Sequence, residues 1–305
     1  SAHFSIGSGT KLALEDAIEL ANTLKAGGDL RERLQHYEAV RGVEVLKIQN
    51  AARNSTEWFE NVARYAGLEP EQFAYSLLTR SQRISHENLR LRDPAWLEGY
   101  ERWLAERSGI ETPASQPPRP PLLTPFTVRG VTLSNRIVVS PTMLYSSQGG
   151  LPGSFHLVHL GGRALGGAGL LITEATAISA DARITPGDPG LWNDEQTAAW
   201  KKITDFVHAE SGARIGVQLS HAGRRGSTQL GWEQPDHPLA EGNWPLLSAS
   251  ALPYRHGLSA VPREATQHDL ECIRDDFVAA ARRAAEAGFD WLELQAGHGF
   301  LLSSF

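Results

Sequence analysis

The sequence has almost no cysteine, no long apolar run and no excess of basic charge. Its one cysteine, Cys272, cannot form a disulfide within the chain. No stretch reaches the ~18 uncharged apolar residues of a membrane-spanning helix, and the net charge of −6 disfavours nucleic acid and anionic membranes as partners. The first residues, SAHFSIGSG, lack an initiator Met and the features of a signal peptide. We therefore expect a soluble, cytoplasmic protein with no nucleic-acid or membrane partner, cut from a longer chain.

Glycine and proline divide the chain into two stretches. Residues 1–110 contain 8 of the 29 glycines and 2 of the 17 prolines. The segment ETPASQPPRPP then holds five prolines, which favour an extended connector. With 305 residues and 41% hydrophobic side chains, the chain is large and apolar enough for two folded domains. We predict a domain over 1–110, a linker over 111–121 and a second domain over 122–305.

The first stretch has the apolar spacing of helices. The first helical pattern ends at Gly27 and Gly28, a common stop signal, and Asp29 is a candidate cap for the next helix. The pattern predicts helices over 12–24, 30–48, 55–65, 70–91 and 94–107. No strand is predicted in this stretch, and the pattern does not show how five helices close a core.

The second stretch alternates between strands and helices. Short β-branched or aliphatic runs predict strands over 137–140, 170–175, 215–220 and 291–295. Helical patterns over 194–211 and 267–288 separate some of them. This alternation predicts an α/β fold with a parallel sheet. Polar residues follow each strand directly, as they do at the active-site face of a (β/α)8 barrel, and the four βα units are half of those needed to close one.

A glycine-rich turn, SIGSGTK, precedes the first helix. Its glycines let a ligand approach the backbone, and free amides at a helix start favour an anion or a carbonyl, although such a turn more often only joins two elements. The surrounding segment, AHFSIGSGTKLALEDAIELA, resembles the segment after the GD motif of single-component, FAD-dependent aromatic hydroxylases. The resemblance implies contacts to the FAD ring from Gly7, Ser8, Gly9, Thr10 and Lys11.

The rest of the first stretch is similar to hydroxylases that act on aromatic CoA thioesters, through NSTEWFENVARY and YSLLTRSQRISHENLRLRD. The GxGxxG and GD motifs of those enzymes do not occur in this sequence, so the resemblance implies only the helical C-terminal end of an FAD-dependent hydroxylase domain. Four arginines are candidates for contacts to CoA phosphates, but a solvated helix face explains such a run better. They are Arg80, Arg83, Arg90 and Arg92.

Five motifs of the second stretch occur in the order and spacing of the old yellow enzyme family of FMN-dependent ene-reductases. They are LSNRIVVSPT, HLVHLGGRALGGAGLLITEAT, RITPGDPGLWNDEQ, QLSHAGRR and LQAGHGFLLSSF. The resemblance implies the first half of a (β/α)8 TIM barrel that holds FMN. The carboxamide of Gln218 suits a flavin edge because it offers both a donor and an acceptor. The implied FMN-binding residues are Ser140, Pro141, Thr142, Met143, Ala175 and Gln218.

The end of the fourth strand departs from the family pattern. Members usually have a His-x-x-His or His-x-x-Asn pair that binds the substrate oxygen and a Tyr two residues later that donates a proton. This chain has Gln295, His298 and Phe300 there. Gln295 can still donate a hydrogen bond, and His298 is the candidate for polarising a substrate carbonyl. Phe300 cannot donate a proton, so the donor is another group or water, unless the substrate needs none there.

No metal site is predicted. His156, His159 and His221 lack the Cys or carboxylate spacing that completes a tetrahedral set. The run GGRALGGAG precedes a strand instead of following one, so loop and helix packing explains it better than dinucleotide binding.

A chain that combines these two resemblances is similar to the anthraniloyl-CoA (2-aminobenzoyl-CoA) monooxygenase/reductase and salicylyl-CoA 5-hydroxylase families. They imply an enzyme that hydroxylates an aromatic CoA thioester with FAD, NAD(P)H and O2, then reduces the dearomatised product by hydride transfer from FMN. The alternatives are salicylyl-CoA hydroxylation without ring reduction, a stand-alone ene-reductase of the old yellow enzyme type, and a non-catalytic fragment. We expect a homodimer for the full-length protein, and the choice between NADH and NADPH stays open.

Overall fold

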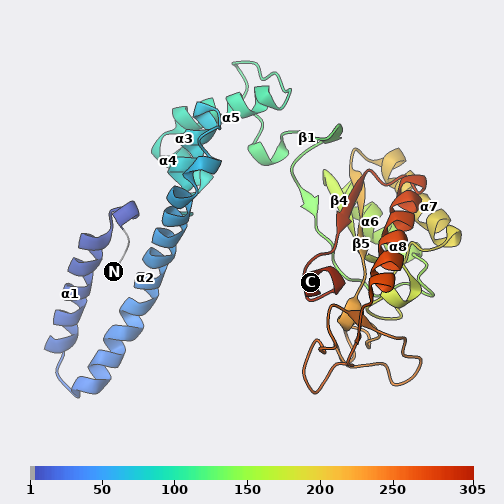
Figure 1. Ribbon diagram of the computed structural model, residues 1–305. Helices are drawn as coiled ribbons and strands as arrows, with labels where there is room; N and C mark the ends of the chain where they lie inside the picture. Colours follow the sequence, from blue (N-terminus) through green and yellow to red (C-terminus); the bar gives the residue numbers. More distant parts are fainter. Residues whose placement is uncertain (1–3) are drawn as a thin grey trace. The chain divides into compact units, whose positions relative to one another are not determined.

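The computed structural model describes residues 4–305, which form two units (Figure 1). The division falls after Pro120, inside the proline-rich segment. The described residues of the first unit contain helices and no strand, whereas the second unit contains both. The assignment of the first unit to a hydroxylase stays a prediction.

The first unit consists of two long helices followed by three shorter ones. Asp29 caps α2, because its Oδ1 accepts hydrogen bonds from the backbone N–H groups of Arg31 and Glu32 at 3.0 and 3.1 Å. The helices are α1 (Gly9–Lys25), α2 (Leu30–Glu60), α3 (Pro70–Thr79), α4 (His86–Arg92) and α5 (Pro94–Arg107), and a short 3-10 helix, η1 (Phe4–Ile6), precedes them.

Two predicted helix boundaries were wrong. The helix predicted over 30–48 and the one predicted from residue 55 are one continuous α2, which ends at Glu60 before a short 3-10 helix, η2 (Val62–Arg64). The residues between the two predicted helices include no glycine or proline, and two of them, Ala51 and Ala52, are buried. The helix predicted over 70–91 is two helices. Gln82 has a left-handed φ of 57°, which is incompatible with a continuous right-handed helix through this residue. Ser85 then caps α4, because its hydroxyl accepts a hydrogen bond from the N–H of Asn88.

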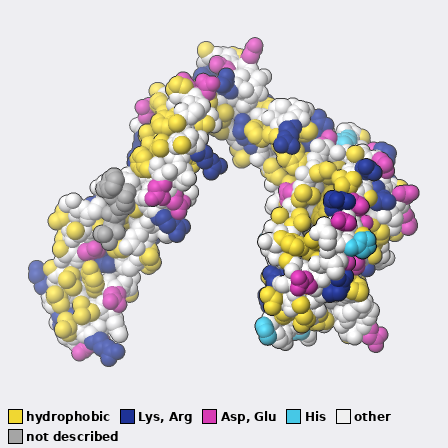
Figure 2. Space-filling view, in the orientation of Figure 1, with side chains coloured by type: hydrophobic (Ala, Val, Ile, Leu, Met, Phe, Trp, Pro, Cys, Tyr) yellow, Lys and Arg dark blue, Asp and Glu magenta, His cyan; other side chains and the backbone are white. Residues whose placement is uncertain are grey.

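Buried side chains of the first unit lie where α3 meets the end of α2 on one side and α5 on another. Trp58 is buried there, donates to the Ser76 hydroxyl at 2.7 Å and stacks on Tyr65. Leu97 and Ala105 of α5 are fully buried. The α1–α2 hairpin instead keeps apolar side chains exposed along its length (Figure 2). These include Leu14, Ile18, Leu30, Val43 and Leu46. The hairpin therefore has no closed core of its own.

The second unit is built on a four-stranded parallel sheet, which confirms the predicted α/β fold. Its strands are β3 (Val138–Val139), β4 (Leu170–Ala177), β5 (Arg214–Ser220) and β8 (Trp291–Leu294), and they pair in that order. The helices α6 (Ser154–Leu165), α7 (Asp194–Glu210) and α8 (Gln267–Glu286) connect successive strands. Two small sheets were not predicted, because their short strands stand outside the alternation of strands and helices on which the prediction rests. They are β1 (Phe126–Val128) with β2 (Val131–Leu133), and β6 (Leu247–Ser248) with β7 (Arg263–Glu264).

Alternation along the strands sorts side chains to two faces of the sheet. Leu171, Ile215 and Val217 face the three helices and form the main core with Trp200 of α7. Leu170 and Ile172 face the opposite side and pack with Leu133 of β2. The same face carries Gln218 and Glu293 farther along β5 and β8. The carboxyl ends of the strands therefore open onto a polar surface.

Candidate active site

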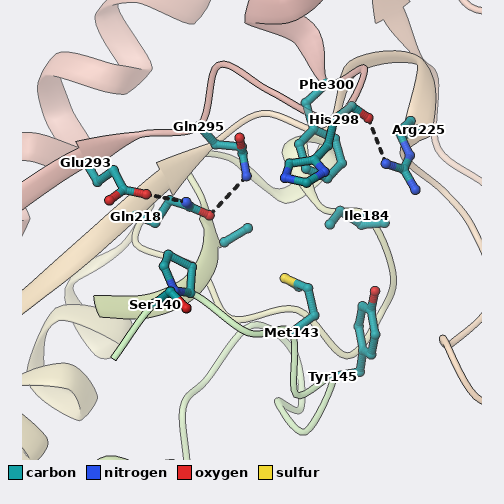
Figure 3. A pocket seen from close by; sticks show the side chains of 12 residues that line it. Ser140, Met143, Tyr145, Ile184, Gln218, Arg225, Glu293, Gln295, His298 and Phe300 are labelled. Carbon is teal, nitrogen blue, oxygen red and sulfur yellow. Dashed lines mark hydrogen bonds between the residues drawn. The ribbon is translucent and has the colours of Figure 1, made fainter. Parts of the chain in front are cut away.

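A cavity of about 500 Å³ lies at the carboxyl ends of the parallel strands (Figure 3). This volume lies in the range of ligand-binding sites, roughly 300–1,000 Å³. Ligands of barrel enzymes bind at this end of the sheet, because the loops after the strands converge there. The cavity is lined by Ser140, Pro141, Met143, Tyr145, Ala175, Ile184, Gln218, Arg225, Glu293, Gln295, His298 and Phe300.

Most of the residues predicted for FMN and substrate come together in this cavity. They are Ser140, Pro141, Met143, Ala175, Gln218, Gln295 and His298. Thr142 does not line it and instead faces a smaller neighbouring cavity beside His159. Among the residues predicted for FAD, Gly9, Thr10 and Lys11 form the first turn of α1 in the first unit, Gly7 precedes them, and Ser8 lines a separate cavity there. The roles assigned to all these residues stay predictions.

Four lining residues were not predicted. Glu293 is two residues before Gln295 on β8 and therefore shares its face, a signal that strand alternation carries. Tyr145 belongs to the same strand-end loop as Met143. Ile184 and Arg225 lie within two of the motifs that resemble the old yellow enzyme family, RITPGDPGLWNDEQ and QLSHAGRR, but no role was predicted for either residue.

A chain of amide and carboxylate groups crosses the cavity wall (Figure 3). Gln218 Nε2 donates to Glu293 Oε1 at 2.6 Å, and Gln295 Nε2 donates to Gln218 Oε1 at 3.3 Å. Gln295 Oε1 accepts from the N–H of Gly297 at 2.9 Å. Each carboxamide keeps one N–H free for a ligand. The wall therefore presents fixed donors beside a carboxylate acceptor.

A β-bulge in β4 sets the direction of the side chains that follow it. Ile172 pairs with Gly216 and Ala175 pairs with Gln218, so β4 has one residue more than β5 over this interval. The extra residue places Ala175 beside Gln218 on the cavity side. It also leaves Glu174 buried, away from the cavity lining.

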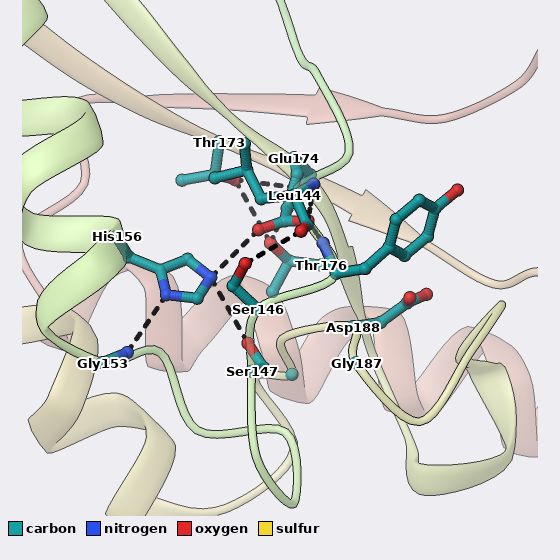
Figure 4. A network of polar contacts seen from close by, with 12 residues as sticks. Leu144, Ser146, Ser147, Gly153, His156, Thr173, Glu174, Thr176, Gly187 and Asp188 are labelled. Atoms are coloured by element: carbon teal, nitrogen blue, oxygen red, sulfur yellow. Dashed lines mark hydrogen bonds and ion pairs between the residues drawn. The ribbon is translucent and has the colours of Figure 1, made fainter. Parts of the chain in front are cut away.

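Glu174 holds the loop that carries Met143 and Tyr145 (Figure 4). Its Oε2 accepts from the backbone N–H groups of Leu144 and Tyr145 at 2.7 and 3.3 Å. Its Oε1 lies 3.0 Å from His156 Nε2, and the Nδ1 of that ring accepts from the N–H of Gly153. His156 therefore carries its proton on Nε2, and this N–H donates a hydrogen bond to Glu174. Both side chains are 1% exposed, so the pair is shielded from water.

The loop after β8 holds His298 in a constrained conformation. Its φ is 59°, a left-handed value that non-glycine residues seldom adopt. Arg225 Nη1 donates to the His298 carbonyl at 2.7 Å, and its guanidinium lies 5.1 Å from the centre of the Phe300 ring. Arg225 is in turn paired with Asp236 at 3.1 Å. These contacts hold the His298 backbone at the cavity.

Among residues 4–305, no group of three or more His, Cys, Asp and Glu side chains is placed to hold a metal ion. His156 is paired with Glu174, and His221 accepts from the N–H of Gly223 at 3.0 Å. No helix in the described range is long and apolar enough to cross a membrane.

We expect His221 to lower stability in acid. Burial lowers its pKa to about 4, whereas an unfolded histidine titrates near 6.5. Between these values the unfolded chain binds a proton that the folded chain does not, so the free energy of unfolding falls as pH drops, by up to about 1.4 kcal/mol per pH unit. The part of the free energy of unfolding that depends on a neutral His221 is complete above pH 6.5 and is lost by about pH 4.

Urea unfolding of the wild type and of His221→Asn at several pH values measures this effect. Burial raises the pKa of Asp188 to about 7, so that carboxyl acts in the opposite direction over the same range. Subtracting the two curves removes the contribution that both proteins share. The wild type is expected to lose stability relative to His221→Asn as the pH falls from about 6.5 to about 4, and parallel curves would contradict the assignment.

The cavity fits the ring of FMN. One wall carries the donors and acceptors of Gln218, Glu293 and Gln295, which match the alternating polar groups of a flavin edge. The opposite side is apolar, where Ile184 and Phe300 pack together with Met143. A flat ring with one polar edge is complementary to such a site.

The second unit is similar to known flavin oxidoreductases. Residues 121–305 match the model of the NADH:flavin oxidoreductase / NADH oxidase family. An NADH:flavin oxidoreductase of Gibberella zeae is 42% identical over 212 residues, covering 66% of this chain and 51% of that protein. An NADPH dehydrogenase of a Geobacillus strain is 39% identical over 186 residues, covering 60% and 50%. Morphinone reductase, solved in complex with tetrahydroNAD, has a TM-score of 0.51 and 32% identity over 60% of this chain and 51% of its own. This chain spans about half the length of these relatives.

Proposed function

Because this chain belongs to the NADH:flavin oxidoreductase / NADH oxidase family through residues 121–305, we propose that its second unit binds FMN in the strand-end cavity and reduces an activated C=C bond with electrons from NAD(P)H. The observation that carries this proposal is the hydrogen-bonded wall of Gln218, Glu293 and Gln295 facing apolar side chains across one cavity. Of the functions expected from the sequence, the stand-alone ene-reductase has better support than the fused hydroxylase and reductase.

Some lining residues would bind the flavin ring, and others would activate the substrate. Gln218 would bind the ring edge, and its amide is held in orientation by Glu293. Bound FMN supplies hydride transfer to the substrate. Gln295 and His298 lie at the end of the same wall and would bind the substrate oxygen, which draws electrons from the double bond. These hydrogen bonds strengthen as negative charge develops on that oxygen.

Reduction of a C=C bond also needs a proton, and we propose that Tyr145 supplies it. Phe300 has no acidic proton, and Tyr145 is the one phenol among the lining residues that the structure describes. Burial raises the pKa of Tyr145, so its hydroxyl stays protonated at neutral pH. The hydroxyl is directed toward the cavity that Met143 and Ile184 line (Figure 3).

Replacing Tyr145 with phenylalanine is expected to lower kcat for the ene substrate by roughly 10²–10⁴, the usual contribution of a positioned general acid. Tyr254→Phe is the matched control, because Tyr254 lies against Arg225 but does not line the cavity. Adding a phenol opposite, in Tyr145→Phe/Phe300→Tyr, should restore part of the rate. An unchanged kcat in Tyr145→Phe would assign proton transfer to His298 or water.

The function itself is tested by mixing the chain with FMN, NADH or NADPH and an α,β-unsaturated ketone without oxygen. We expect coenzyme oxidation that depends on both FMN and the ketone, with the saturated ketone as product. The variant Gln295→Leu/His298→Leu should oxidise coenzyme at less than a hundredth of that rate, because no donor binds the ketone oxygen. Coenzyme oxidation at the same rate with and without the ketone would contradict an ene-reductase.

Hydroxylation of an aromatic CoA thioester is the second candidate. It draws support from the separate helical unit, in which the loop of Gly7 and Ser8 leads into the start of α1. FAD titration of the chain tests it, with Gly7→Val as the variant, since Gly7 has a φ of 63°. FAD binding that the variant abolishes would support a flavin contact at this loop, and no binding would oppose it.

A further inference from the structure

The first unit contains a cavity of about 280 Å³ whose charged lining is basic. The cavity lies beside η1, the start of α1 and the turn between α3 and α4. The guanidinium groups of Arg80, Arg83 and Arg92 line it, and none of the described lining residues is acidic. Three like charges around one cavity repel one another unless an anion lies among them.

Arg80 is fixed in place by neutral acceptors. Its Nε donates to the Ser55 hydroxyl at 3.0 Å, its Nη1 to the Leu77 carbonyl at 2.7 Å and its Nη2 to the Ser5 carbonyl at 3.0 Å. A guanidinium has five N–H groups, so two remain for a ligand. Neutral acceptors orient the group but leave its positive charge uncompensated.

Arg83 and Arg92 differ from their neighbour Arg90. Arg90 lies 2.7 Å from Glu101 and 3.1 Å from Glu87, which compensates its charge. Within the described residues, neither Arg83 nor Arg92 has a carboxylate within ion-pair distance. Arg83 is the smallest of the influences that lower the pKa of Glu44, and that carboxylate already pairs with Lys47 at 2.7 Å. Arg83 and Arg92 are exposed, as expected of a solvated helix face, but both also line this cavity, which Arg90 does not.

The remaining lining indicates what kind of anion fits. Ser8 precedes α1 and makes no side-chain bond to the helix start, so the positive end of this 17-residue helix is not capped by it. Ile6, Leu78 and Ile84 line the cavity with apolar groups. One guanidinium group can donate two parallel hydrogen bonds to two oxygens of a phosphate. The apolar side chains suit an organic group attached to that phosphate.

We propose that this cavity binds the phosphate group of a phosphorylated organic molecule. Arg83 and Arg92 compensate its charge, and Arg80 donates from a fixed position. The proposal concerns the first unit alone and does not rest on the flavin chemistry of the second.

Isothermal titration of the whole chain tests this at constant ionic strength, with inorganic phosphate, adenosine monophosphate and coenzyme A as probes. The variant is Arg83→Gln/Arg92→Gln, and Arg53→Gln is the control, since Arg53 is an exposed arginine paired with Glu57. We expect at least one organic phosphate to bind more tightly than inorganic phosphate, and the double variant to weaken its binding at least tenfold. The control should bind like the wild type.

Three outcomes would overturn the proposal: no binding of any probe, equal weakening by the control, or equal affinity for inorganic and organic phosphates. Preference for one of the two organic probes identifies the source of the phosphate and supports the proposal. Thermal unfolding without phosphate checks the fold, because removing two repelling charges should not lower the Tm of the double variant. A rise in Tm on adding the organic phosphate should occur in the wild type and be lost in the double variant.

Discussion

Replacing His156 with alanine is expected to lower the free energy of unfolding of the second unit by roughly 1–3 kcal/mol or more, the usual cost of leaving a buried carboxylate without one of its hydrogen-bond donors. His156 donates to Glu174 at 3.0 Å, and both side chains are 1% exposed. Without the imidazole, one carboxylate oxygen loses its donor at a place that water does not reach. Urea unfolding followed by circular dichroism measures the effect.

His159→Ala is the matched control, because His159 lies one turn further along α6 and is only half-buried. Its replacement should cost less than about 1 kcal/mol, as for a side chain with no buried polar partner. Since Glu174 also holds the backbone of Leu144 and Tyr145, His156→Ala should in addition weaken FMN binding. Equal destabilisation by the two variants would contradict the role assigned to the pair.

Replacing Gln218 with leucine is expected to weaken FMN binding about tenfold to a hundredfold. The change removes the polar contacts to the flavin edge and leaves Glu293 without its donor at 2.6 Å. An unpaired polar group at a binding site costs about 1–3 kcal/mol, and each 1.4 kcal/mol is a factor of about ten in Kd. Quenching of FMN fluorescence on titration with protein measures the Kd.

Gln267→Leu is the control for this variant, because Gln267 is exposed at the start of α8 and pairs with Glu271. It should bind FMN like the wild type. Circular dichroism of both variants separates loss of binding from loss of fold. Wild-type affinity in Gln218→Leu would show that the flavin edge lies elsewhere.

The parallel sheet and much of its cavity were predictable from the sequence, because strand alternation and strand-end positions are local properties. Gln218 and Gln295 were predicted from the resemblance to the old yellow enzyme family at the ends of these strands, and both line the cavity. The role of Glu174 was not predictable. It depends on the bulge between Ile172 and Ala175, which the sequence does not mark because this segment contains no glycine or proline.

Similar reasons explain the errors in the first unit. The break between α3 and α4 depends on the left-handed backbone of Gln82, a residue that sequence patterns do not mark as a turn. The arginines of this region look alike in sequence. Only their placement separates Arg90, which is paired with Glu101, from Arg83 and Arg92, which line a cavity.

The central claim is that the strand-end cavity of the second unit binds FMN, and the flavin content of the protein tests it most directly. The chain would be saturated with an equimolar mixture of FMN and FAD, freed of unbound flavin, denatured, and the released flavins separated by chromatography. We predict about one FMN per chain for the wild type and a clearly lower FMN content for Gln218→Leu. Release of no FMN, or equal FMN from both proteins, would contradict the account.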